Sequence, residues 1–137
     1  MAKMLGIDFG LKRTGLAMTD AANIIASPLE YVESSELMGR LIALVEKEKI
    51  SVIVLGLPMN LNNTPTDITA NIYLLKEALE KQFPSVLVDL QDERFSSSIA
   101  INAMIQGGTK KSKRQEKGII DKVSASVILQ SYLDRKR

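Results

Sequence analysis

The chain has 137 residues, 45% of them hydrophobic and 25% charged, a composition typical of one globular domain spanning residues 1–137. It contains no cysteine and no histidine, which excludes disulfide frameworks, thiolate nucleophiles, Ser–His triads and the usual zinc sites. Its apolar runs are shorter than the roughly 20 residues of a membrane span, and no signal-peptide pattern is present. We therefore expect a cytoplasmic protein whose chemistry uses carboxylates, lysines, hydroxyls or a hard metal ion.

The net charge of +2 is distributed unevenly along the chain. Residues 109–118 carry five cations against the single acid Glu116, and residues 135–137 add three cations, so the remainder of the chain carries −5. An acidic body with basic segments near its end favours a polyanionic partner. A solvated loop and a frayed tail explain the same charges equally well.

Strands and helices alternate in the predicted order of elements. The pattern predicts strands at 3–9, 13–20 and 23–32, a helix at 34–49, a strand at 51–56, a helix at 67–83, a strand at 86–91 and helices at 96–108 and 119–136. A hairpin joins the first two strands, Pro28 favours an edge or a bulge for the third, and Ser34 or Ser35 can cap the next helix. This order predicts an α/β fold with a mixed sheet, antiparallel at first and then parallel, and helices on both faces.

Three carboxylates stand at positions where such sheets gather their sites. Asp8 lies in the first strand, Glu93 follows the last strand together with Asp92, and Asp121 begins the final helix. Sites collect at the carboxyl ends of central strands, so these carboxylates can converge. A cluster of carboxylates requires a cation, and oxygen ligands suit magnesium or manganese.

Each acid also has a structural explanation. Asp8 can be a buried carboxylate whose hydrogen bonds are satisfied, and Glu93 can pair with Arg94. Asp121 can interact only with the helix dipole. Asp92 is better explained as a cap or turn residue than as a ligand.

Four segments together resemble the YqgF family, also called RuvX. They are GIDFGLKRTGLAMTD, GLPMNLNN, DERFSS and DKVSASVILQSYLD, and they span nearly the whole chain. The resemblance implies a ribonuclease H-like fold, a relation to the RuvC Holliday junction resolvases, and a catalytic, metal-binding set of Asp8, Glu93 and Asp121. Lys122 departs from the family, which commonly has a small residue there, and its ammonium can pair with Asp121.

The resemblance implies a metal-dependent nuclease that uses one or two Mg²⁺ or Mn²⁺ ions. We expect it to be an endonuclease. Two substrates have been proposed for the family: the 5′ end of pre-16S ribosomal RNA and the four-way DNA junction. A non-catalytic nucleic-acid-binding factor in transcription or ribosome assembly is the rival. A sugar-kinase-type phosphotransferase, which shares the D-x-G motif, needs two such domains and is too large for this chain.

We expect a monomer or weak homodimer that binds structured nucleic acid and no membrane. The residues expected to contact it are Gly10, Lys12, Arg13, Arg94, Lys110, Lys111, Lys113, Arg114 and Lys117. Because aromatic residues make up only 4% of the chain, base stacking is expected to contribute little.

Overall fold

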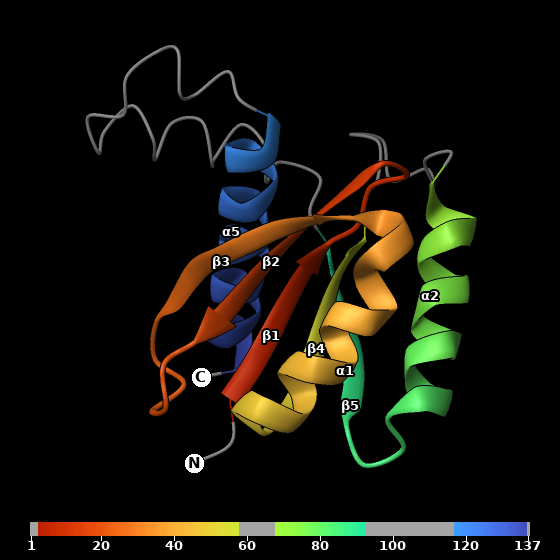
Figure 1. The fold of residues 1–137 in the computed structure, drawn as a ribbon. Helices are drawn as coiled ribbons and strands as arrows, with labels where there is room; N and C mark the ends of the chain where they lie inside the picture. The colour runs from red at the N-terminus through yellow and green to blue at the C-terminus, as the bar shows by residue number, and fades with distance from the viewer. Residues whose placement is uncertain (1–2, 58–67, 93–116, 137) are drawn as a thin grey trace.

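A five-stranded mixed sheet forms the centre of the molecule (Figure 1). The computed structural model describes residues 3–57, 68–92 and 117–136. The strands are β1 (Lys3–Asp8), β2 (Arg13–Thr19), β3 (Ala26–Glu33), β4 (Ile50–Leu57) and β5 (Leu87–Asp92), in the order β3-β2-β1-β4-β5. The first three strands pair antiparallel, and β4 and β5 add in parallel with β1. This confirms the predicted mixed sheet, with β1 as its central strand.

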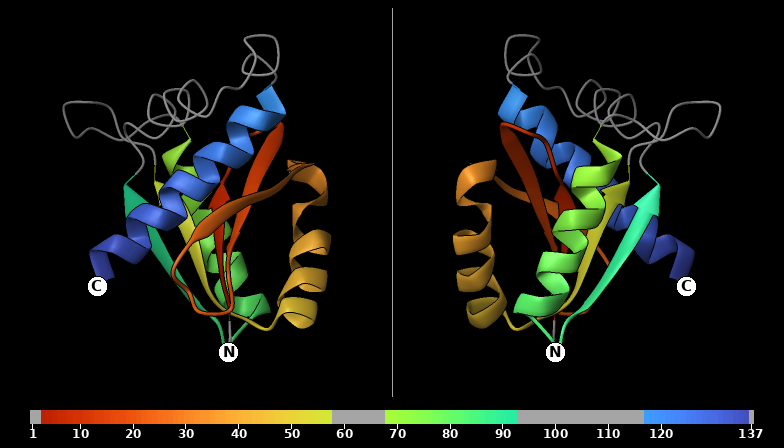
Figure 2. Two further views of the ribbon diagram at one scale, coloured as in Figure 1. Left: turned by 90° about the vertical axis from the view of Figure 1, so that its left-hand side faces the viewer. Right: turned by 90° about the vertical axis from the view of Figure 1, so that its right-hand side faces the viewer.

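Helices cover both faces of the sheet, as predicted. The short 3₁₀ turn η1 (Ser34–Glu36), α1 (Leu37–Glu48) and α2 (Thr69–Gln82) belong to one face, and α5 (Lys117–Lys136) crosses the other (Figure 2). None of the helices in the described parts of the chain is long and apolar enough to cross a membrane. The helix predicted at 96–108 lies outside the described residues.

Strand alternation divides the apolar side chains into two cores. Leu5, Ile7 and Leu55 belong to a larger core shared with α1 and α2. Under α5 a second core forms from Ala17, Val54, Ala125, Ile128, Leu129 and Tyr132. Successive residues of a strand face opposite sides, so β4 contributes to both cores, which agrees with its unbroken apolar run.

The third strand is an edge strand with an irregular register. Pro28 lies opposite Ala17, and the pairing of β2 with β3 shifts between Leu16 and Ala17. Proline has no backbone N–H to donate, so it is accommodated where a strand has one neighbour or a bulge. The predicted position of Pro28 is therefore confirmed in both respects.

The predicted cap of the first helix is wrong. Glu36 is the N-cap of α1, and neither η1 nor α1 has a side-chain cap hydrogen bond. Ser34 instead fixes the turn between β1 and β2. Its hydroxyl donates to the Gly10 carbonyl, and its amide donates to the Lys12 carbonyl at 2.9 Å. The buried Thr14 hydroxyl lies 2.8 Å from Ser34 Oγ, and it donates there because the Ser34 proton is already engaged.

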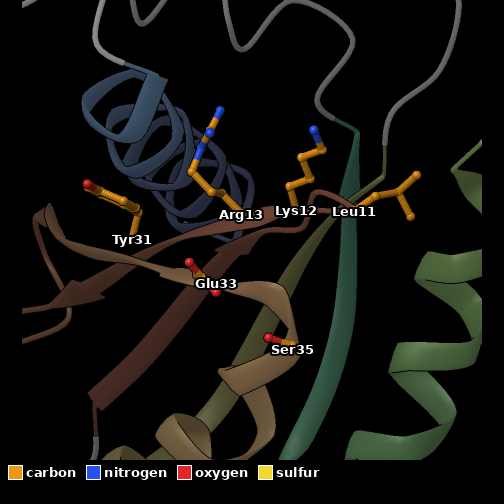
Figure 3. Close-up of a pocket in the computed structure, with 6 residues that line it drawn as sticks. All are labelled: Leu11, Lys12, Arg13, Tyr31, Glu33 and Ser35. Carbon is orange, nitrogen blue, oxygen red and sulfur yellow. The ribbon is translucent and has the colours of Figure 1, made fainter.

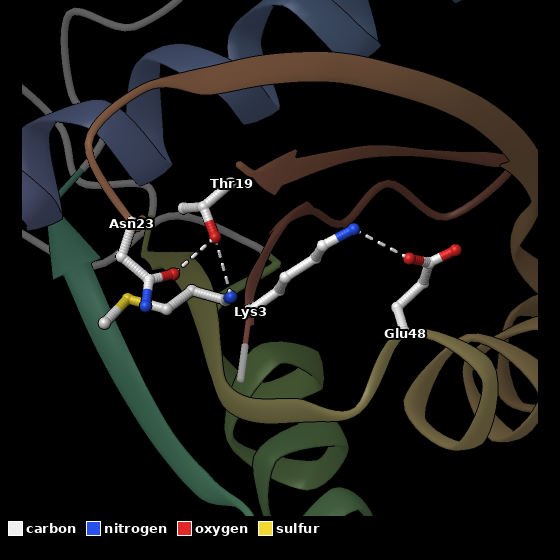
Figure 4. A network of polar contacts seen from close by, with 5 residues as sticks. Lys3, Thr19, Asn23 and Glu48 are labelled. Carbon is white, nitrogen blue, oxygen red and sulfur yellow. Dashed lines mark hydrogen bonds and ion pairs between the residues drawn. The ribbon is translucent and has the colours of Figure 1, made fainter. Parts of the chain in front are cut away.

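Polar contacts fix the opposite, amino-terminal end of β1 (Figure 4). The Met4 amide donates to Thr19 Oγ1 at 2.9 Å, and the Thr19 hydroxyl donates to Asn23 Oδ1 at 2.6 Å. Lys3 Nζ donates to Glu48 Oε1 at 2.9 Å, which joins β1 to the end of α1 and holds the pKa of Glu48 below its usual value. The start of β1 is thus tied to β2 and to α1.

A close backbone approach fixes α5 on the central strand. A Cβ built on Gly6 of β1 would lie 2.7 Å from Leu129 Cβ and 3.0 Å from the Ala125 carbonyl oxygen. No real side chain tolerates such distances, so only glycine permits this seat for α5. Residues Ala125 and Leu129 are one helical turn apart and face Gly6 together.

Farther along, a buried tyrosine joins α5 to β5. The Tyr132 hydroxyl donates to Asp89 Oδ2 at 2.9 Å, and the Arg135 guanidinium lies 5.2 Å from the centre of the Tyr132 ring. Burial first, and the Asp89 carboxylate second, raise the pKa of Tyr132 to about 12. The folded protein therefore favours the neutral phenol.

We predict opposite effects for two glycine substitutions. Gly6→Ala should lower the free energy of unfolding by about 1–3 kcal/mol, because the methyl group pushes α5 away from β1. Gly39→Ala in α1 is the matched control, since nothing lies within 4 Å of its Cβ position. It should raise the free energy by roughly 0.5–1 kcal/mol through the better helix propensity of alanine. Urea unfolding measures both, and a Gly6→Ala variant as stable as the parent would contradict the close seat of α5.

We predict a stability change at high pH that depends on Tyr132. An unfolded tyrosine ionises near its usual pKa of about 10, whereas folded Tyr132 does so at about 12. The stabilisation is complete below pH of about 10 and is lost as the pH rises toward about 12, because only the unfolded chain ionises in that window. Thermal unfolding of the parent and of Tyr132→Phe isolates this loss, since all other titrating groups are shared. Parallel curves for the two proteins would contradict it.

Candidate functional site

Asp8 lies at the carboxyl end of the central strand in a row of mostly small residues. Asp8 is partly exposed and pairs with Gly15 of β2. On the other side Ile7 pairs with Leu55, so Asp8 is level with Gly56 of β4, and Gly56 in turn pairs with Gln91 of β5. Neither strand beside Asp8 places a side chain next to it. Asp8 therefore faces the α5 side of the sheet with a glycine opposite it on each neighbouring strand.

Two buried polar atoms on the same face have no hydrogen-bond partner among the described residues. They are Gln91 Oε1 and Ser124 Oγ. Gln91 is two residues beyond Asp89, which reaches Tyr132, so Gln91 also faces α5. Ser124 belongs to α5 and is only 1% exposed. Leaving such an atom unpaired costs about 1–3 kcal/mol, so each of them is expected to meet a water, a ligand or a residue outside the described ranges.

These donors fit the metal that the sequence predicts. A carboxylate, an amide oxygen and a hydroxyl are hard oxygen ligands, which suit hydrated magnesium or manganese. Among the described side chains no three acidic residues come together as metal ligands. Of the three predicted acids, however, only Asp8 has a described side chain, because Glu93 and the side chain of Asp121 lie outside the described part of the structure.

The structure corrects the position of Asp121 in the final helix. α5 begins at Lys117, and no acidic residue occupies its first turn. Lys117 and Gly118 extend the helix predicted at 119–136 by two residues into the basic segment. Asp121 is therefore the fifth helical residue, in the second turn, and does not begin the helix. The helix dipole acts mainly within the first turn, which weakens the purely electrostatic explanation of this acid. Glu93 follows Asp92, the last residue of β5, and lies outside the described residues.

Two of the predicted nucleic-acid contacts line a pocket beside the β1–β2 turn (Figure 3). The pocket has a volume of about 460 Å³ and is lined by Leu11, Lys12, Arg13, Tyr31, Glu33 and Ser35. Gly10 begins the turn, and a Cβ there would lie 2.4 Å from the Arg13 carbonyl oxygen. Its role is thus to permit the tight turn that presents Lys12 and Arg13.

The other predicted contacts are not placed. Arg94, Lys110, Lys111, Lys113 and Arg114 lie outside the described residues, and Lys117 is the first residue of α5 with its side chain undescribed.

Several residues of the site were not predicted from the sequence. Gly56 was identifiable, because it ends a buried strand and begins the GLPMNLNN segment. Gln91, Ser124 and Tyr31 carry no signal of their own. They join the site only through the register of the strands and the placement of α5.

Comparison with known proteins agrees with the motifs. A family model described as "RuvX: Holliday junction resolvase" matches residues 2–135. A protein of Phocaeicola vulgatus named "Putative pre-16S rRNA nuclease" is 42% identical over 137 residues, with 100% of this chain and 99% of the relative covered. A protein of the same name from Bacteroides thetaiotaomicron is 40% identical over 137 residues, again with 100% of this chain and 99% of the relative covered.

Solved structures share the fold at low identity. RuvC of T. thermophilus in complex with a Holliday junction substrate superposes with a TM-score of 0.59 at 15% identity, covering 99% of this chain and 96% of that one. The yeast mitochondrial Holliday junction resolvase gives 0.52 at 14% identity, covering 96% and 78%. These likenesses confirm the ribonuclease H-like fold. The family match and the full-length relatives show that this chain belongs to the RuvX family.

Proposed function

We propose that this protein is a metal-dependent nuclease that hydrolyses phosphodiester bonds in structured nucleic acid. The observation that carries the proposal is Asp8, a partly exposed carboxylate at the end of the central strand with glycines level with it on both sides. A carboxylate at the carboxyl end of a central strand is a hard oxygen ligand, and a nearby cation favours its ionised form. Gln91 Oε1 and Ser124 Oγ, which have no hydrogen-bond partner within the described ranges, lie on the same face of the sheet and are further oxygen atoms for a hydrated ion.

The seat of α5 supports Asp121 as the second acid. Ala125 faces Gly6, Asp121 is one helical turn before Ala125, and Asp8 is two residues beyond Gly6 on the same face of β1. The carboxyl end of β1 and the amino-terminal end of α5 lie at the same end of the sheet (Figure 1), so Asp8 and Asp121 both lie toward that end. Asp8 and Asp121 are therefore expected to approach each other. Glu93, directly after β5, completes the proposed set.

The division of work follows from these residue types. Asp8, Glu93 and Asp121 would hold one or two Mg²⁺ or Mn²⁺ ions, and Lys12 and Arg13 would hold backbone phosphates. Such ions, when bound, supply Lewis acidity that activates water at neutral pH and stabilises the leaving oxygen. This suits a chain without histidine, since no side-chain base is then required.

Pre-16S ribosomal RNA is the proposed substrate, with processing at its 5′ end. Relatives at 40–42% identity over the whole chain carry the name of a pre-16S rRNA nuclease. The four-way DNA junction is the second candidate, favoured by the family description and by the fold shared with junction resolvases. Purified protein with Mn²⁺ on both labelled substrates, side by side, distinguishes them, and cleavage of neither would favour a non-catalytic binding factor.

We predict that Asp8→Asn abolishes cleavage and leaves the fold intact. The loss should exceed the roughly 10–100-fold that substitution of a residue behind the metal ligands costs. Without metal, the variant should melt at a higher temperature than the parent, because repulsion among carboxylates is reduced. Asp92→Asn, which neutralises an exposed acid at the end of β5, is the matched control and should retain activity. An Asp8→Asn variant that unfolds, or one that still cleaves, would count against Asp8 as a ligand.

We predict that the basic segment binds phosphates without regard to sequence. Exchanging Lys110, Lys111, Lys113 and Arg114 for glutamine should weaken binding equally for all sequences. It should also reduce the slope of log K against log salt by up to about 0.9 per lost contact on duplex DNA. Exchanging Lys47 on α1, its C-cap Lys49, and Lys76 and Lys81 on α2 removes the same charge from the face that α1 and α2 cover, and should leave the slope unchanged. Equal slopes in all three proteins would identify the segment as a solvated connector.

A further inference from the structure

The pocket at the β1–β2 turn has a composition that the proposed reaction does not explain. Lys12 and Arg13 suit phosphates, but the wall also contains Tyr31 and Leu11, which are 51% and 71% exposed. Its volume of about 460 Å³ is within the roughly 300–1,000 Å³ of small-molecule sites. Cations, an aromatic ring and an acidic group in one pocket match the parts of a nucleotide.

We propose that this pocket is a subsite for one unpaired nucleotide of the substrate strand, with the base stacked on Tyr31 and the phosphate held by Lys12 and Arg13. The inference rests on the proposed function and adds a substrate class to it: strands with an unpaired nucleotide close to the cleaved bond. A base inside a duplex already stacks on both neighbours, so only an unpaired base offers a face to Tyr31.

Preorganisation of the turn supports the phosphate end of the subsite. Ser34 donates its hydroxyl to the Gly10 carbonyl and its amide to the Lys12 carbonyl, so the backbone that carries Lys12 is fixed before any ligand arrives. Figure 3 shows the Lys12 and Arg13 side chains extending from this turn in similar directions. Because the backbone that carries the two cations is already ordered, phosphate binding needs to order only their side chains, which lowers its entropic cost.

Charge gives the nucleotide a direction. Glu33 lies opposite Arg13 in the register of β2 and β3, and both line the pocket. A carboxylate repels a phosphate but accepts hydrogen bonds from a base N–H or a ribose hydroxyl. The phosphate is therefore directed toward Lys12, and the nucleoside toward Glu33 and Tyr31.

Register also sets the distance to the reaction centre. Tyr31 pairs with Gly15, which pairs with Asp8, so Tyr31 and Asp8 share one face and are two strand spacings apart, or roughly 10 Å. This equals roughly three stacked nucleotides at 3.4 Å per step. One strand can thus occupy the pocket and reach Asp8 at the same time.

The test compares two hairpins in EDTA, so that binding is measured without cleavage. One RNA hairpin carries a short unpaired tail with 2-aminopurine, and the other is blunt. The parent and Tyr31→Phe should prefer the tailed hairpin, by roughly 5- to 100-fold if stacking on one ring supplies the preference, and should quench 2-aminopurine. Tyr31→Leu should bind both hairpins equally without quenching. Tyr73→Leu is the matched control, since Tyr73 on α2 is 50% exposed, and it should behave as the parent does.

Several results would overturn the subsite. The first is a Tyr31→Leu variant that keeps the preference for the tailed hairpin and the quenching, and the second is an equal loss of both in Tyr73→Leu. The others are tighter binding of free AMP than of the tailed hairpin, and no binding of either hairpin. Cleavage by Asp8→Asn separates this failure from failure of the proposed function. If Asp8→Asn abolishes cleavage but Tyr31→Leu still prefers the tailed hairpin, only the pocket is rejected. If Asp8→Asn still cleaves but Tyr31→Leu loses the preference, only the reaction centre is rejected.

Discussion

The contact between Gly6 and α5 is the constraint on which the rest of the structure depends. The helix lies so close to β1 that a single methyl group on Gly6 would meet Leu129 and the Ala125 carbonyl. This closeness lets Ala17 and Val54 form a second core with α5. It also brings the helix residues before Ala125 to the end of the strand that carries Asp8. A strand residue without a side chain thus decides where two carboxylates far apart in the sequence are expected to meet.

Charge and space are matched at this end of the sheet. Asp8 is level with Gly15 and Gly56, so the neighbouring strands leave room for whatever accompanies its charge. The cations of the turn, Lys12 and Arg13, line a pocket on the far side of β2. A carboxylate at Asp8 beside the cations Lys12 and Arg13 suits the proposed polyanionic substrate. The cations would hold its phosphates, and the proposed metal-dependent step would occur at one of them.

The sequence predicted the framework well because periodicity is a local property. Strands buried on both faces, amphipathic helices and the edge position of Pro28 all follow from spacing, and the structure confirms them. Two local predictions were wrong. Ser34 had a better acceptor in the turn 24 residues earlier, and α5 begins two residues before the predicted helix, in a basic stretch that the apolar period did not mark.

The site was less accessible to sequence reasoning, since its residues gain meaning through register. Asp8 was conspicuous because a carboxylate is rare in an apolar strand. Gln91 and Tyr31 are ordinary residues until pairing places them on the row of Asp8, each on an edge strand that lies two strands from β1. Ser124 resembles any small helix residue until its hydroxyl is buried with no partner among the described side chains.

The division of the apolar side chains into two separate clusters has a consequence for how the molecule opens. The larger cluster unites α1, α2 and the sheet without α5, whereas the smaller one exists only while α5 is seated. Regions with separate packing open as separate cooperative units. Detachment of α5 would leave the larger cluster closed while it removes the proposed ligand Asp121, so slow hydrogen exchange in β1 and β4 would coexist with a subpopulation that lacks this proposed ligand. With Asp121 as a proposed ligand, activity would then depend on the docking equilibrium of α5 as well as on global unfolding.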